Sequence, residues 1–139
     1  MKEQLVSFET AKLAKEKEFN ELTNAMYSTK DIGNWEPKLN IGFNGDCSVH
    51  LVLWNEQHTV DFLYKYYSAP TQSLLQKWLR DEHSFHVDID YDANGTWFYV
   101  VSRYPSGDVV ECDINNNMYN SFENCLEDGL IHALKHGIN

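Results

Sequence analysis

The sequence has no run of about 18 consecutive apolar residues, the length that a membrane-spanning helix requires. Its first residues become charged and amphipathic at once, so the apolar segment of a secretory signal peptide is missing. The three cysteines, Cys47, Cys112 and Cys125, are odd in number and form no CxxC pair, a pattern that favours reduced thiols. These absences predict a cytoplasmic protein that does not interact with a membrane.

Basic side chains are also few. The 11 Lys and Arg residues stand against 21 Asp and Glu residues, which gives a formal net charge of −10. Phosphate contacts need a positive surface, so this composition argues against direct binding of nucleic acid. The chain is nevertheless 42% hydrophobic and 14% aromatic, which argues against disorder. Its length predicts a single domain over residues 1–139 that needs no disulfide or metal to fold.

Three segments combine the apolar spacing of a helix with a capping residue. The first begins after Ser7, whose hydroxyl can accept a hydrogen bond from a first-turn amide. The second, with the clearest apolar stripe, begins after Thr71, which follows a proline. The third begins after Ser121 and keeps its spacing until Gly137. Residues 20–38 are rich in Asn, Thr, Asp, Gly and Pro and are predicted to be mainly loop.

Alternating apolar and polar residues predict two groups of strands between these helices. They lie at 47–54 and 60–67, with a short edge strand at 41–43, and at 85–92 and 96–104, with a last short strand at 109–112. Helices and strands then follow the order α-β-β-α-β-β-(β)-α. The predicted fold class is α+β, with helices packed on one face of an antiparallel sheet.

Asn94-Gly95 is the strongest hairpin signal in the chain, because this pair suits the positive φ angles of a two-residue turn. Such a turn would place Ile89 opposite Val100 and Tyr91 opposite Phe98 on the buried face. The other face would carry His86, Asp88, Asp90 and Asp92 against Trp97, Tyr99, Val101 and Arg103. Trp97 and Tyr99 would then be exposed aromatic residues of a binding surface, unless a helix or loop of the chain covers them.

The negative charge is concentrated in one part of the sequence. Residues 81–139 carry 11 acidic and two basic side chains, a net charge of −9, whereas residues 1–80 are almost neutral. One interpretation is that this charge serves solubility alone. The other is a surface for a basic protein partner, with Asp88, Asp90, Asp92, Trp97 and Tyr99 as its candidate residues.

A cation is the alternative ligand of the same hairpin. Asp90, Asp92 and Asn94 follow the alternating spacing of the first half of a calcium loop, and a glycine comes next. The closing bidentate carboxylate is missing, because its position is Val101. The flanking segments are also predicted as strands rather than helices. These three residues are therefore weak metal candidates, and a solvated acidic hairpin explains the same pattern.

Enzyme signatures are missing from the sequence. It contains no phosphate-binding glycine loop, and no nucleophile stands in a recognisable pattern with a histidine. His132 and His136 share one helix face, as paired zinc ligands do, but the glutamate of an HExxH motif is absent. Histidines in a last helical turn also interact favourably with the helix dipole. No catalytic residue and no cofactor are predicted.

Three blocks of the chain resemble a known group of proteins. They are the opening at 6–15, the second helix with its flanks at 69–83, and the ending Phe122-Glu123 with its following apolar stripe. These blocks resemble small uncharacterised proteins of Bacteroides-type gut bacteria and of their phages or prophages. The resemblance implies a bacterial or phage setting and no particular activity.

Taken together, these patterns favour a non-enzymatic protein-interaction module that uses its acidic hairpin and its last helix. A mimic of nucleic acid that occupies a DNA-binding protein is one version of this hypothesis. The alternative is a domain that binds calcium or a small ligand at residues 90–95.

Overall fold

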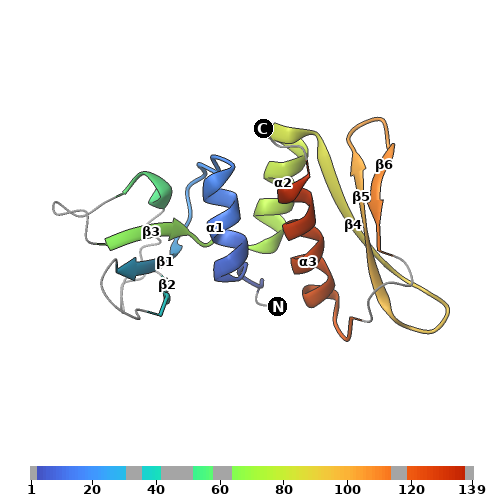
Figure 1. The fold of residues 1–139 in the computed structure, drawn as a ribbon, viewed down its shortest axis with the longest axis horizontal. Helices are drawn as coiled ribbons and strands as arrows, with labels where there is room; N and C mark the ends of the chain where they lie inside the picture. The colour runs from blue at the N-terminus through green and yellow to red at the C-terminus, as the bar shows by residue number, and fades with distance from the viewer. Residues whose placement is uncertain (1–2, 31–35, 42–51, 58–63, 114–118, 137–139) are drawn as a thin grey trace. The chain divides into compact units, whose positions relative to one another are not determined.

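The computed structural model describes residues 3–30, 36–41, 52–57, 64–113 and 119–136 (Figure 1). Within these residues the chain forms three α-helices and two three-stranded antiparallel sheets, so the predicted α+β fold class is confirmed. The elements are α1 (Phe8–Glu16), β1 (Ala25–Lys30), β2 (Lys38–Ile41), a 3₁₀ turn η1 (Trp54–Glu56), β3 (Tyr64–Ser68), α2 (Gln72–His83), β4 (Phe85–Tyr91), β5 (Trp97–Arg103), β6 (Val109–Cys112) and α3 (Phe122–Lys135).

Contacts divide the chain into two compact units. The amino-terminal unit consists of residues 5–70, and the carboxy-terminal unit consists of residues 71–139 together with residues 1–4. Each unit has its own sheet, with the strand order β2-β1-β3 in the first and β4-β5-β6 in the second. The single domain over residues 1–139 stays a prediction.

In the amino-terminal unit, α1 packs against β3. The helix begins where the sequence predicts, because the Ser7 hydroxyl oxygen accepts a hydrogen bond from the Thr10 amide at 3.3 Å. Its buried face is made of small residues, including Ala11 and Ala14. At its first turn the Phe8 ring meets the ring of Tyr67 edge-on, with a centroid distance of 5.2 Å.

The prediction that residues 20–38 are mainly loop is wrong for residues 25–30, and residues 31–35 lie outside the described residues. Residues 25–30 form the central strand β1, which pairs with β2 on one edge and with β3 on the other. Its sequence AMYSTK shows no clear alternation of apolar and polar residues. The segment is therefore a strand because both of its edges are paired, a tertiary effect that local propensity does not reveal.

The other strands predicted for this unit are described only in part. Residues 42–51 and 58–63 lie outside the described residues, and with them most of the predicted strands 41–43 and 47–54. Val52 forms an isolated bridge with Thr23, and the 3₁₀ turn η1 follows it. The end of the predicted strand 60–67 is confirmed as β3.

In the carboxy-terminal unit, α2 and α3 pack together and cover the same face of the sheet (Figure 1). Thr71 and Ser121 cap these two helices as predicted, because their hydroxyl oxygens accept hydrogen bonds from Leu74 and Asn124 amides. The helices and strands contribute the fully or almost fully buried side chains of Leu75, Leu79, Leu130, Leu134, Phe85, Val87, Tyr99 and Val101.

The predicted register of the β4–β5 hairpin is wrong by one residue. Ile89 pairs with Tyr99 and Tyr91 pairs with Trp97. The reason is that three residues, 93–95, lie between the closing residues Asp92 and Thr96, and not two. The Asp92 amide donates to the Thr96 carbonyl at 3.0 Å and closes this loop. Gly95 takes a positive φ of 78°, as it does in a three-residue hairpin loop.

This shift exchanges the two faces of β5, because side chains alternate along a strand. Tyr99 and Val101 lie on the face that α3 covers, with exposed fractions of 1% and 0%. Phe98 and Val100 lie on the opposite face and are half-buried. The expectation that Tyr99 is an exposed aromatic residue is therefore wrong.

Gly129 lies where α3 packs closely against this sheet. A Cβ atom at this position would lie 2.8 Å from Val87 Cγ1 and 3.0 Å from Tyr99 Cβ.

We expect Gly129→Ala to lower the free energy of unfolding by about 1–2 kcal/mol, since overpacking outweighs the gain in helix propensity. Urea denaturation measures this change. Asn124→Ala, at an exposed position of the same helix, is the control and should leave stability unchanged or raise it slightly; a stabilised Gly129→Ala would contradict the close packing.

Candidate functional site

The hairpin loop uses the carboxylate of Asp92 for its own structure. Asp92 Oδ1 accepts hydrogen bonds from the amides of Asn94 at 2.9 Å and Thr96 at 3.2 Å, and Oδ2 accepts one from the Thr96 hydroxyl at 2.9 Å. These bonds, first that of the Thr96 hydroxyl and then that of its amide, hold the pKa of Asp92 below its usual range. Asp92 is therefore a loop-closing residue more than an available ligand.

Asp88 and Asp90, by contrast, project from the face of the sheet that the helices leave open. Both are exposed, and their cross-strand partners are Val100 and Phe98. Each carboxylate accepts only the amide of the next residue in the chain, at 3.0 Å for Asp88 and 2.8 Å for Asp90. Within the described residues, neither carboxylate forms an ion pair with a Lys or Arg side chain.

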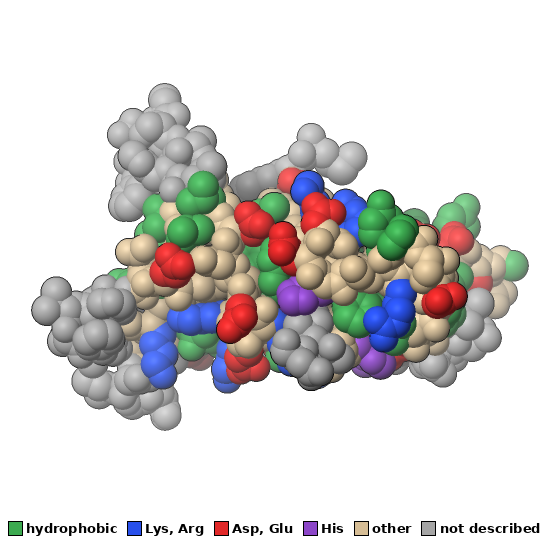
Figure 2. Space-filling view, turned by 90° about the horizontal axis from the view of Figure 1, so that it is seen from above, with side chains coloured by type: hydrophobic (Ala, Val, Ile, Leu, Met, Phe, Trp, Pro, Cys, Tyr) green, Lys and Arg blue, Asp and Glu red, His purple; other side chains and the backbone are tan. Residues whose placement is uncertain are grey.

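We call this face, defined by Asp88, Asp90, Phe98 and Val100, the acidic sheet face. Both helices of the unit lie on the other side of the sheet, and no described element of the unit covers it (Figure 1). It combines two negative charges with two half-buried apolar side chains. Elsewhere, Figure 2 shows apolar side chains that reach the surface in separate places among charged ones.

Three aromatic rings lie together at the loop end of the same hairpin. The Trp97 ring is 5.2 Å from the ring of Tyr91 and 5.6 Å from the ring of Phe122, measured between centroids. Tyr91 is 61% exposed and Phe122 41% exposed, whereas Trp97 is half-buried between them. We call these three residues the aromatic cluster. Trp97 lies on the same face of the sheet as Tyr99, so the prediction that it shares a face with Asp88 and Asp90 is wrong. Sequence reasoning missed its neighbours Tyr91 and Phe122.

The predicted metal residues Asp90, Asp92 and Asn94 differ in what they contact. Asp92 is engaged by the loop, while Asp90 lies on the acidic sheet face and Asn94 is exposed at the loop tip. Strands flank the loop on both sides, as the hairpin interpretation requires. In the part of the chain that the structure describes, no three His, Cys, Asp or Glu side chains are grouped so that they could hold a metal ion.

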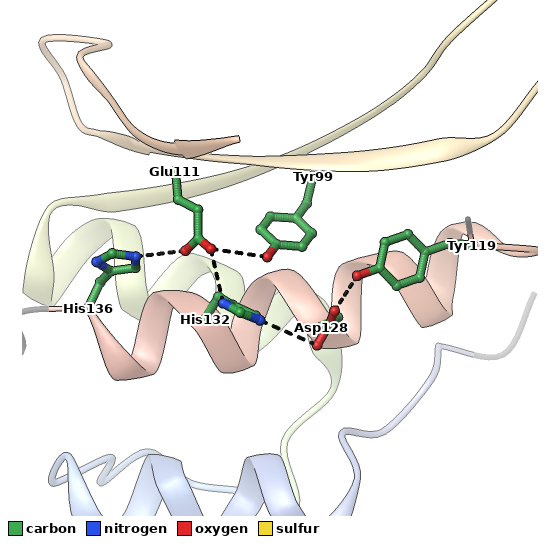
Figure 3. Close-up of polar contacts among 6 residues, drawn as sticks. All are labelled: Tyr99, Glu111, Tyr119, Asp128, His132 and His136. Atoms are coloured by element: carbon green, nitrogen blue, oxygen red, sulfur yellow. Dashed lines mark hydrogen bonds and ion pairs between the residues drawn. The ribbon is translucent and has the colours of Figure 1, made fainter. Parts of the chain in front are cut away.

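A second group of polar side chains joins β6 to α3 (Figure 3). Glu111 lies at its centre: one carboxylate oxygen is 2.7 Å from His136 Nε2, and the other is 3.1 Å from His132 Nδ1. The Tyr99 hydroxyl donates to Glu111 Oε1 at 3.4 Å. The shared helix face of His132 and His136, noted from the sequence, therefore faces a carboxylate of the neighbouring strand.

The network continues along α3 to Asp128. His132 Nε2 is 3.8 Å from Asp128 Oδ1, and the Tyr119 hydroxyl donates to Asp128 Oδ2. Burial and then the nearby carboxylates raise the pKa values of Tyr99 and Tyr119, so both phenols remain protonated donors at neutral pH. Burial also raises the pKa of the Cys125 thiol to about 12, which makes it a poor nucleophile. We interpret this network as a structural tie between strand and helix.

The structure also bears on the sequence predictions about cysteines and membrane spans. Cys112 and Cys125 carry no disulfide, and Cys47 lies outside the described residues. None of the described helices has the length and apolar character needed to cross a membrane. No protein-family model matches this chain, and neither a curated protein nor a solved structure is significantly similar to it.

Asp92 gives the hairpin a pH-dependent stability. Its pKa is lower in the folded state than in the unfolded state. The ionised carboxylate therefore contributes fully to folding stability above the unfolded-state pKa of about 3.9, and this contribution is lost as the pH falls through the folded-state pKa. We expect Asp92→Asn to lower the urea midpoint more at pH 7 than at pH 3. Asp90→Asn removes the same charge without a loop bond and is the control. An equal loss for Asp92→Asn at both pH values would show that its charge does not stabilise the loop.

Glu111 should be worth more to stability than an exposed glutamate. Glu111→Ala removes the described carboxylate partner of the Tyr99 hydroxyl and of the His136 ring, and it leaves His132 with Asp128 alone. We expect a loss of about 1–3 kcal/mol at pH 7, the cost of unsatisfied, partly buried hydrogen-bonding groups. Urea denaturation measures it, with the exposed Glu82→Ala as the reference. Equal stability of the two variants would contradict a structural role for the network.

Proposed function

We propose that this protein is a non-enzymatic interaction module that binds a basic protein partner through the β4–β5 hairpin. One observation carries the proposal: Asp88 and Asp90 are exposed on an open sheet face, opposite the apolar residues Val100 and Phe98. Two neighbouring carboxylates without a basic counterpart repel each other in the isolated protein. A partner that supplies Lys or Arg side chains relieves this repulsion and also steers association.

Apolar contact area for such a partner is available on the same hairpin. Phe98 and Val100 stand between the carboxylates and the edge strand β6, whereas the aromatic cluster lies at the loop end on the face that α3 covers. Large aromatic residues supply much of the binding energy in protein interfaces, and acidic neighbours add specificity. The proposal therefore keeps Asp88 and Asp90 from the sequence analysis, assigns Asp92 to the loop, and replaces Trp97 and Tyr99 with Phe98 and Val100.

The concentration of acidic residues in this part of the chain supports a basic partner over an acidic one. Residues 81–139 have a net charge of −9, and Arg103, the basic residue of the hairpin, lies at the far end of β5. A DNA-binding protein whose nucleic-acid site is occupied by this surface is one partner of the required chemistry. The setting that we infer is cytoplasmic, in a bacterium or its phage, as the sequence and its resemblance predict.

The test compares protein capture by two double variants of equal net charge. Asp88→Asn with Asp90→Asn removes the charge of the acidic sheet face. Glu82→Gln with Glu123→Gln removes two exposed carboxylates elsewhere in the unit. Each immobilised protein is incubated with bacterial lysate at low and high salt, and the captured proteins are quantified by mass spectrometry.

We expect the wild type and the Glu82/Glu123 variant to retain the same basic proteins, and the Asp88/Asp90 variant to lose most of them. Capture by the wild type should also fall as salt increases, because the contact is electrostatic. Equal recovery of the same proteins by both double variants would contradict the proposal.

A further inference from the structure

The amino-terminal unit contains a groove that has no part in the hairpin surface. It lies beside α1 and β3 and has a volume of about 390 Å³. Sites for small molecules commonly measure roughly 300–1,000 Å³, so this groove is large enough for a small ligand. Its lining consists of Lys12, Lys15, Glu16, Gln57, Tyr64, Lys65 and Tyr67.

Lys15 is held in a defined position in this groove. Its ammonium donates a hydrogen bond to the Tyr66 carbonyl oxygen at 2.8 Å and lies 4.7 Å from the centroid of the Tyr67 ring. The side chain is half-buried, with its methylene stem against the protein. An ammonium group has three donor hydrogens, so Lys15 can bind a ligand while it keeps the contact with Tyr66.

The groove gathers positive charge on a protein that is strongly acidic. Among the described residues, three lysines line it with one carboxylate, Glu16, and no ion pair joins Glu16 to Lys12, Lys15 or Lys65. Burial, and then repulsion by Lys65, hold the pKa of Lys15 below its ordinary value. An anion bound between these ammonium groups would remove this repulsion and stabilise their charged forms.

The walls of the groove favour a ring attached to that anion. Tyr64 and Tyr67 contribute aromatic rings, and the lysine side chains contribute their methylene stems. We propose that the groove binds a small aromatic anion, a flat ring that carries a phosphate or carboxylate group. The ring would lie against the tyrosines, and the anionic group would lie among Lys12, Lys15 and Lys65. This proposal is independent of the hairpin surface and of its partner.

Calorimetric titration at low ionic strength tests both parts of the proposed ligand. Phenyl phosphate is the probe, benzoate has the same ring with a carboxylate, inorganic phosphate lacks the ring, and phenol lacks the anionic group. We expect phenyl phosphate to bind with a dissociation constant of about 1 mM or below. Inorganic phosphate and phenol should each bind at least about tenfold more weakly, since each loses one set of contacts. Benzoate carries less negative charge than phenyl phosphate, so its affinity should lie between that of phenyl phosphate and those of the two partial probes.

Two double variants of equal net charge locate the site. Lys12→Gln with Lys65→Gln removes two charges from the groove and leaves Lys15 and its contacts in place. Lys38→Gln with Lys135→Gln removes two exposed lysines outside it. The first variant should weaken phenyl phosphate binding about tenfold or more, and the second should not change it. Absence of binding by the folded wild type, or equal loss in both variants, would overturn the proposal.

Discussion

Asp92 and Thr96 close a three-residue loop, and this closure fixes which residues of β4 and β5 face each other. The carboxylate of Asp92 accepts both backbone and hydroxyl hydrogen bonds within the loop, and Gly95 supplies the positive φ that the loop needs. Side chains alternate along a strand, so the choice of loop decides the position of every side chain on β5. Tyr99 consequently packs under α3 at Gly129, while Phe98 faces the open side of the sheet.

The proposed interaction surface is a direct consequence of this register. With Tyr99 and Val101 in the core, the residues opposite Asp88 and Asp90 are apolar, and within the described residues neither carboxylate forms an ion pair with a Lys or Arg side chain. On the covered face, Tyr99 and Glu111 meet the histidines of α3 and tie β6 to the helix. The hairpin loop thus places the structural network on one face of the sheet and the proposed binding residues on the other.

The sequence predicts the helices well, because caps and apolar stripes are local signals. Ser7, Thr71 and Ser121 all cap the helices that were expected after them. It predicts β1 poorly, since that strand is defined by its pairing on both edges and not by its own residues. The candidate site was found in part: Asp88 and Asp90 were identified by their pattern. Trp97 and Tyr99 were assigned to the wrong face of the sheet, because a two-residue and a three-residue loop around Asn94-Gly95 have the same sequence signal.

The register of the hairpin is the central claim, and nuclear Overhauser contacts of the Tyr99 and Phe98 rings test it most directly. The structure predicts strong contacts from the Tyr99 ring to the Val87 methyl groups and to the Gly129 α-protons, since these atoms lie around the close approach of α3. It also predicts that the Phe98 ring shows contacts to neither. Contacts from the Phe98 ring to Gly129, with Tyr99 exposed to solvent, would establish the two-residue turn and contradict the account.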